Sequence, residues 1–147
     1  MKLIPLTQGK FAKVDDEDFK RVNEYKWCYS GHGYAYRKMN GKHVYMHTFI
    51  SGYPITDHKD MDGLNNQRNN LREATKSTNG MNRKMSTNNV CGFKGVVKSG
   101  KTGWVARLET QGTKIYLGTF RTKELAARAY DEKAKELFGE FAHLNFP

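Results

Sequence analysis

Four polar side chains in the middle of the chain have the chemistry to hydrolyse a phosphodiester bond: Asp57, His58, Asn70 and Asn79. The Asp57 carboxylate and the Asn79 amide oxygen suit Mg²⁺ or Mn²⁺, because such ions prefer oxygen ligands and keep positions open for water and phosphate. The His58 imidazole titrates near neutral pH and can take a proton from an attacking water. The alternative is that an Asn-rich loop uses these side chains only to satisfy its own turns.

The surrounding pattern decides between these interpretations. It consists, in order, of His47, Asp57-His58, Gly63-Leu64-Asn65-Asn66, Asn69-Asn70-Leu71-Arg72, Thr75 and Asn79. This pattern, over residues 44–82, strongly resembles the HNH nuclease motif of phage and intron homing endonucleases, a ββα fold around one metal ion. The last residue of the motif is Asn rather than His, which makes an H-N-N variant, and Met61 stands where Gly is common.

The resemblance implies a role for each matched residue. Asp57 and Asn79 would bind the metal, His58 would be the general base, and Asn70 would pin the loop that orients His58. His47, expected on a strand, would contact DNA or support the site. The implied reaction leaves a 5′-phosphate and a 3′-hydroxyl, and the sequence leaves open whether one or both strands are cut.

The elements around this motif predict an α+β fold for the first part of the chain. Short runs with period-two alternation, ending with Val44 to Phe49, predict a small antiparallel sheet. Acids followed by bases in Asp15 to Val22 predict a short helix. Residues 57 to 72 predict a long structured loop, and Leu71 to Asn82 a short helix.

A polar, Asn-rich segment then predicts a tether between two modules. We expect a nuclease domain in residues 1–82, with its ββα-metal motif at about 44–82. A linker would follow in residues 83–91, where Arg83 and Lys84 would track the DNA backbone. The last domain would occupy residues 92–147.

The last domain predicts a three-stranded antiparallel sheet packed on one helix. The strand-like runs are Phe93 to Lys98, Trp104 to Glu109 and Lys114 to Phe120. Thr122 would cap a helix that Gly139 ends, with apolar positions that include Leu125 and Leu137. Three alanines, at 126, 127 and 129, would let this helix approach the sheet closely.

Charge is distributed unequally between this sheet and its helix. Residues 92–121 carry six Lys or Arg against one acid, whereas residues 122–140 carry four against five acids. Because the helix covers one face of the sheet, the excess positive charge should lie largely on the free face and meet phosphate. The alternative is an ordinary solvated surface.

The same stretch, Gly92 to Pro147, resembles the plant ethylene-response-factor (Apetala-type) DNA-binding domain. The matching blocks are Gly92-Phe93-Lys94-Gly95-Val96, Gly103-Trp104-Val105-Ala106, Ile115-Tyr116-Leu117-Gly118-Thr119-Phe120, Ala126-Ala127-Arg128-Ala129-Tyr130-Asp131 and Leu144-Asn145-Phe146-Pro147. The resemblance implies that the sheet enters the major groove of double-stranded DNA. Lys94, Lys98, Arg107 and Lys114 would contact phosphates or bases, and Trp104 would pack under the sheet.

Several of the family's contact positions differ here. Val97, Arg107 and Tyr116 stand where the plant domains usually carry Arg, Glu and Trp. We therefore expect DNA binding without the plant recognition sequence.

The whole-chain composition agrees with a nucleic-acid partner, because 25 Lys and Arg against 15 Asp and Glu give a formal charge of +10 over 147 residues. We expect no membrane partner, no protein partner and a cytoplasmic location, since neither an apolar span nor a secretion signal is visible. Cys28 and Cys91 are expected as reduced thiols, with a disulfide between them as the alternative. Two other functions stay open: a non-catalytic DNA-binding regulator and a binder of structured RNA.

Overall fold

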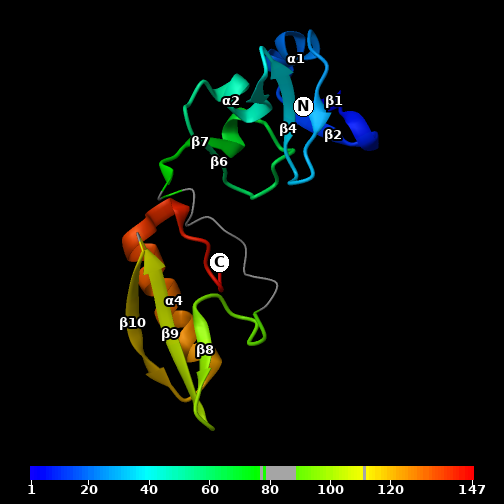
Figure 1. Ribbon diagram of the computed structural model, residues 1–147. Coiled ribbons are helices and arrows are strands. Elements are labelled where there is room, and N and C mark those ends of the chain that lie inside the picture. Colours follow the sequence, from blue (N-terminus) through cyan, green and yellow to red (C-terminus); the bar gives the residue numbers. More distant parts are fainter. Residues whose placement is uncertain (77, 79–88, 111) are drawn as a thin grey trace. The chain divides into compact units, whose positions relative to one another are not determined.

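The computed structural model describes every residue of the chain except 77, 79–88 and 111. The chain divides into two compact units, Met1–Lys76 and Ser77–Pro147, each with hydrophobic core residues of its own (Figure 1). None of the helices in the described ranges is long and apolar enough to cross a membrane. The predicted boundary at residue 82 and most of the predicted linker fall outside the described residues, so this division stays a prediction.

The first unit is built from short elements that form three small antiparallel sheets instead of the single sheet predicted. The sheets are β1–β2, β3–β4–β5 and β6–β7. In chain order, the elements are β1 (Lys2–Pro5), η1 (Thr7–Gly9), β2 (Phe11–Val14), α1 (Asp16–Asn23), β3 (Cys28–Tyr29), β4 (Ala35–Met39), β5 (Lys42–Tyr45), α2 (Met46–Ser51), β6 (Thr56–His58), η2 (Arg68–Asn70) and β7 (Leu71–Glu73).

The helix α1 forms where the acids and bases predicted it. Three acids occupy its first turn, and Lys20 and Arg21 occupy its last, so both ends complement the helix dipole. Val22 is fully buried, and its carbonyl oxygen accepts a 2.8 Å hydrogen bond from the Trp27 indole. This bond satisfies the one polar group of a large buried ring.

The strand predicted for Val44 to Phe49 is wrong in its second half. The strand β5 ends at Tyr45 and the helix α2 follows at once, so His47 lies on a helix. Met46 and Ile50, four residues apart, are both buried on one helix face, and Gly52 ends the helix with a φ of 76°. A short run of apolar residues fits the period of a strand and that of a helix equally well. Here the helix forms, because it buries both Met46 and Ile50 in the core.

The predicted loop of residues 57 to 72 is also corrected, because its two ends pair as strands. The strand β6 runs antiparallel to β7, with Asp57 opposite Arg72 and His58 opposite Leu71. The helix predicted from Leu71 therefore starts later: Lys76 is its first described helical residue. The polar side chains of Asp57 and His58 are tolerated in these buried strands because they have hydrogen-bond partners in Arg72 and Asn66.

The second unit has the predicted sheet and helix. Its elements are β8 (Val96–Ser99), β9 (Gly103–Thr110), β10 (Thr113–Phe120), α4 (Lys123–Phe138) and η3 (Gly139–Phe141). The strands lie in the order β10-β9-β8, and α4 packs on one face of them (Figure 1). The Thr122 side chain caps α4 by accepting from the Leu125 amide, and Gly139 follows the helix with a φ of 50°.

Small residues let α4 and the sheet approach closely, as expected. Ala126 and Ala127 are fully buried, and a Cβ on Gly95 would lie 2.0 Å from the Tyr130 ring. Leu125 and Leu137, expected in the core, are instead 51% and 42% exposed, because a single sheet covers only one side of the helix.

Candidate active site and nucleic-acid interface

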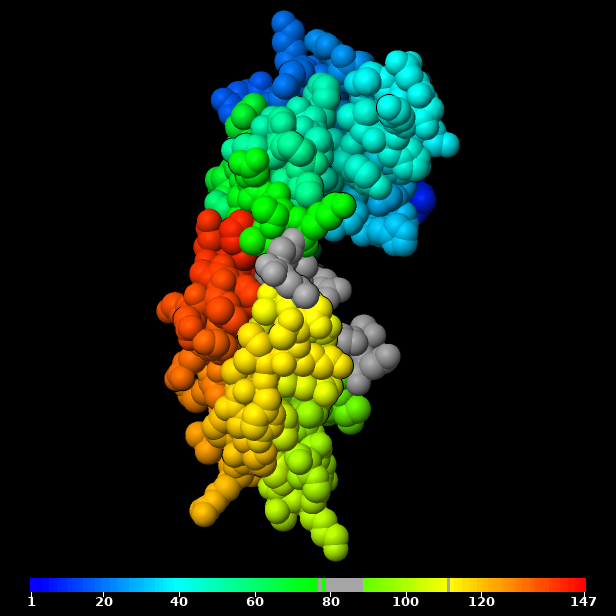
Figure 2. Space-filling model, turned by 60° about the vertical axis from the view of Figure 1, so that its left-hand side comes forward, coloured from blue at the N-terminus to red at the C-terminus, as the bar shows by residue number. Residues whose placement is uncertain are grey.

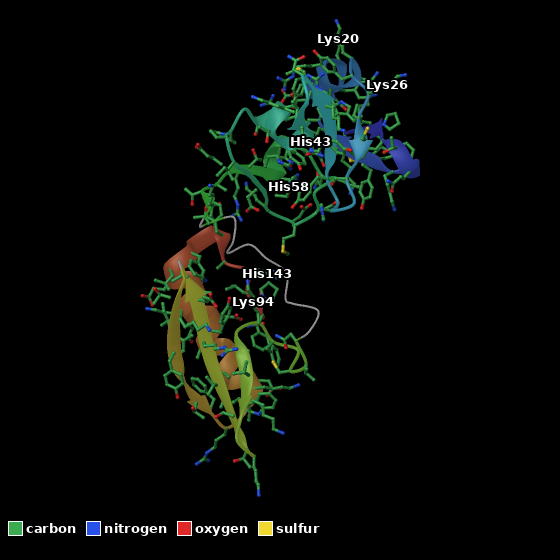
Figure 3. All side chains as sticks on the ribbon, in the orientation of Figure 1. Lys20, Lys26, His43, His58, Lys94 and His143 are labelled. Carbon is green, nitrogen blue, oxygen red and sulfur yellow. The ribbon has the colours of Figure 1, made fainter. Side chains whose placement is uncertain are left out.

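The ribbon β6–β7 carries the central residues of the site. Asp57 and His58 are adjacent in β6, and each is only 5% exposed (Figure 3 labels His58). Both Nε and Nη2 of Arg72, across the ribbon, donate to Asp57 Oδ2, at 2.9 and 2.7 Å. The pair is almost completely buried, with 10% of the Arg72 and 6% of the Asp57 side chain exposed.

The His58 imidazole is buried and held by an asparagine. Its Nε2 lies 3.3 Å from the Asn66 side-chain oxygen, and Asn66 itself is fully buried. Burial lowers the pKa of His58, while the hydrogen bond that His58 makes to Asn66 and the charges of Asp60 and Asp57 oppose this shift. His58 is therefore neutral at pH 7 and able to accept a proton.

A second histidine lies next to the first. The His47 ring on α2 is 5.0 Å from the His58 ring, edge to face, and it stacks on Tyr45 at 5.4 Å. Burial, with a smaller effect of the charge on His58, lowers the pKa of His47 to about 4. Its Nδ1 is buried and has no hydrogen-bond partner in the part of the chain that the structure describes.

Asn70 joins two points of the loop between the strands of the ribbon. Its Oδ1 accepts from the Asp60 amide, and its Nδ2 donates to the Asp60 carboxylate and to the Asn65 carbonyl oxygen. Met61 within this loop has a φ of 59°, a conformation that favours glycine, the residue common at this position in the HNH motif.

The loop is fixed to α1 by two carboxylates about fifty residues earlier in the chain. Asp18, only 2% exposed, accepts from the guanidinium groups of both Arg21 and Arg68. Asp15 accepts from the Gln67 side chain and the Arg68 amide, and these hydrogen bonds lower its pKa. The sequence presented these acids only as first-turn helix residues, so it gave no signal for this contact.

The oxygen donors expected for a divalent cation are only partly described. Among the described residues, no three His, Cys, Asp or Glu side chains converge as a metal site. Asp57 offers one carboxylate, whose Oδ2 accepts from Arg72. The second expected oxygen donor, Asn79, lies outside the described residues. Mg²⁺ keeps several waters and needs only one or two carboxylates.

Strand register shows which side chains lie on the free face of the second unit's sheet. Ala106 and Leu108 are buried under α4, so Arg107 between them points to the opposite face, where Tyr116 is its cross-strand partner. Lys114 is the cross-strand partner of Glu109 on the same face. Figure 2 shows atoms of β9, in yellow, open on the surface of this unit.

Two of the predicted DNA contacts lie elsewhere in this unit. Lys98 is opposite Trp104, which packs against the core as expected, so Lys98 lies on the helix side of the sheet at the exposed strand end. Lys94, labelled in Figure 3, precedes β8, and its backbone N–H and C=O both bond the Asn145 side chain. Arg83 and Lys84 lie outside the described residues.

Comparisons with known proteins cover both units. No family model matches the chain. It is 35% identical over 146 residues to an uncharacterized HNH endonuclease of Acanthamoeba polyphaga mimivirus, which covers 94% of this chain and 76% of the relative. A shorter stretch is 45% identical over 62 residues to dehydration-responsive element-binding protein 2A of Arabidopsis thaliana, 41% of this chain and 18% of that protein.

Another plant relative is an ethylene-responsive transcription factor of Medicago truncatula, 38% identical over 85 residues. This match covers 56% of the chain and 32% of the relative. The chain therefore spans less than a third of either plant protein.

Proposed function

The chain belongs to the HNH endonuclease family and carries an ethylene-response-factor-like DNA-binding domain, and we propose that it cuts DNA with one divalent metal ion at a site chosen by its C-terminal sheet. The observation that carries this proposal is the buried, neutral His58 directly beside the buried carboxylate of Asp57. A proton acceptor and an anionic oxygen donor are the two groups that metal-assisted hydrolysis requires.

In the proposed reaction His58 acts as the general base. Asn66 accepts from Nε2–H of His58, and this tautomer places the imidazole lone pair on Nδ1. A water gives its proton to this nitrogen while its oxygen forms a new bond to phosphorus. The bond from phosphorus to the 3′-oxygen breaks, the 3′-oxygen leaves with the electron pair and takes a proton from solvent water, and the products are a 5′-phosphate and a 3′-hydroxyl.

The metal would be held by Asp57 and, as the motif implies, by Asn79. When bound, Mg²⁺ or Mn²⁺ polarises a phosphate oxygen and stabilises the leaving 3′-oxygen. Arg72 fixes the direction of the Asp57 carboxylate through its two hydrogen bonds to Oδ2. Asn70 keeps the loop closed over the ribbon, which holds Asn66 against His58.

The C-terminal sheet would anchor the enzyme on duplex DNA. Arg107 and Lys114 lie on its free face and are the side chains we propose for phosphate and base contacts. Lys94 and Lys98 would contribute from the edge of the sheet, and Arg83 and Lys84 from the connecting segment. Such site-directed cutting would be of the homing type.

The test compares the full chain with its His58→Ala variant on double-stranded DNA, with Mg²⁺ and with EDTA. We expect metal-dependent cutting by the wild type, loss of cutting in the variant, and unchanged DNA affinity. Asn69→Ala, at an exposed loop position, serves as the matched control and should cut normally. Equal DNA binding without any metal-dependent cutting by the wild type would instead favour a non-catalytic regulator.

A further inference from the structure

The hairpin β4–β5 has one face that does not contribute to the core. Ala35 is buried in the core, and Arg37 on the same face lies 3.7 Å above the Tyr25 ring. Residues between and beyond them point the other way. Strand pairing places Tyr36 opposite Tyr45 and Lys38 opposite His43, so this outer face carries Tyr36, Lys38, His43 and Tyr45.

The rings of this face continue without interruption to the candidate general base. His43 contacts Tyr36 at 4.7 Å, and Tyr36 lies 6.3 Å from Tyr45. Centroid separations of 5.0 to 6.2 Å then join Tyr45, Tyr34, His47 and His58. His43 and His58, both labelled in Figure 3, are the two ends of this aromatic row.

The loop of the site holds the inner part of the aromatic row in place. A Cβ on Gly63 would lie 2.5 Å from the Gly33 carbonyl oxygen and 2.6 Å from the Tyr34 ring. The loop backbone therefore passes directly against Tyr34, which is 38% exposed. The row thus leads from the solvent-exposed hairpin to the loop that covers His58.

Charge at the hairpin end of the aromatic row, away from the acids around His58, favours a polyanion. Residues 25 to 56 include no Asp or Glu, but they include four Lys or Arg and three His. Lys38 lies on the same hairpin face as the rings. Aromatic side chains beside cations are the means by which proteins hold single-stranded nucleic acid, because bases stack on the rings and cations meet the backbone.

We propose that the aromatic row is a stacking platform for the bases of an unpaired DNA strand that leads to the cleaved phosphate. This proposal rests on the proposed function and names its substrate more closely: DNA that is opened or branched beside the cut. Duplex DNA offers only base edges and backbone to such a surface, because its base faces are already stacked. An unpaired strand exposes those faces.

The test uses the full wild-type chain in EDTA, so that DNA is bound without metal-dependent cutting and every ring of the row stays in place. Fluorescence anisotropy compares a blunt duplex with the same duplex carrying a short thymidine tail at its 5′ or its 3′ end. We expect the preferred tail to raise affinity about fivefold or more, since one stacked base contributes about 1–3 kcal/mol. In 2-aminopurine-labelled tails, fluorescence should fall on binding as the base stacks.

Variants then connect this preference to the rings. Tyr36→Leu with Tyr45→Leu should abolish the preference for the tail and leave blunt-duplex affinity within about twofold, while Tyr36→Phe with Tyr45→Phe should keep it. Tyr53→Leu is the control, because Tyr53 lies outside the row and is 38% exposed, close to the 36% of Tyr45. A far-ultraviolet circular dichroism melt of each variant checks that it folds.

The outcomes separate this proposal from the proposed function. If the wild type cuts DNA but tailed and blunt duplexes bind equally, the platform is wrong and the nuclease assignment stands. Retention of the tail preference in the double leucine variant, or a stronger preference for an RNA tail, also overturns the platform. Absence of cutting by the wild type, with the tail preference intact, counts against the nuclease assignment alone.

Discussion

Asn66 offers the sharpest test of how the loop controls His58. It is fully buried, its Oδ1 is 3.3 Å from His58 Nε2, and its Nδ2 has no partner among the described residues. We predict that Asn66→Ala lowers the single-turnover cleavage rate about 10- to 100-fold, a part of the 10²- to 10⁴-fold that a general base typically supplies. DNA affinity should stay unchanged.

The expected effect of this substitution on stability is small. Loss of the hydrogen bond between His58 and Asn66 costs about 1–3 kcal/mol, because both groups are buried. Removal of the unpartnered Nδ2 offsets a similar amount, because that buried donor already carries its desolvation penalty. We therefore expect the free energy of unfolding to fall by no more than about 2 kcal/mol, as measured by urea denaturation.

The pH dependence of cleavage shows in which direction each Asn66 substitution changes the pKa of His58. Burial lowers the pKa of His58, and the hydrogen bond that its Nε2 makes to the Asn66 oxygen opposes this larger effect. Asn66→Ala should therefore lower this pKa further and move the acid limb of the rate profile to lower pH. Asn66→Asp places a carboxylate beside the ring and should move the same limb to higher pH.

Single-turnover rates in Mg²⁺ between pH 5 and 8 would measure both shifts. Asn69→Ala is the control, because this neighbouring loop asparagine is exposed. Limbs that move in the same direction for both Asn66 variants, or rates within twofold of the wild type, would refute the reasoning.

Other predictions concern stability and DNA binding. Because burial lowers the pKa of His47 from 6.5 in the unfolded chain to about 4 in the folded one, its contribution to the stability of the first unit should be complete above pH 6.5 and about 3 kcal/mol smaller at pH 4. Urea midpoints should therefore fall less on acidification in His47→Phe than in the wild type, and equal falls would contradict this. Arg72→Met should destabilise the first unit by about 3–5 kcal/mol in the same assay, because it breaks a buried ion pair and removes both guanidinium hydrogen bonds to Asp57; a change below 1 kcal/mol would contradict this. Arg107→Ala with Lys114→Ala should lower the slope of log affinity against log salt by about 2, and an unchanged slope would remove these side chains from the interface. Asp131 accepts three hydrogen bonds from Asn145 and Phe146 in the C-terminal tail. Asp131→Ala should therefore destabilise the second unit by about 3 kcal/mol and speed amide hydrogen exchange in this tail. Exchange protection equal to that of the wild type would disprove the anchoring.

The sequence was a good guide where the signal is local. Thr122, the alanines of α4 and Gly139 define one helix, because capping, close approach and termination each depend on a few neighbouring residues. Asp57 and His58 were identified as a pair because they are adjacent in the chain. Leu125 shows the limit of local patterns. Its spacing fits the apolar stripe of α4, but it is 51% exposed, because the sheet covers only one side of the helix.

Sequence alone could not locate the contacts that hold the site together. Asn66 is one of several similar asparagines in its segment, and only the folded loop shows that it meets His58. Asp18 looked like a first-turn helix acid, yet it binds Arg68, fifty residues away.

By itself, then, the sequence determined the chemical groups of this protein and the periodicity of its longer elements, because both are properties of short stretches of chain. The tertiary structure decided which groups meet. It ended β5 at Tyr45, turned His47 onto a helix beside His58, and joined the hairpin rings to them in one row. Those outcomes depend on burial of Met46 and Ile50 in a shared core, which no local pattern specifies.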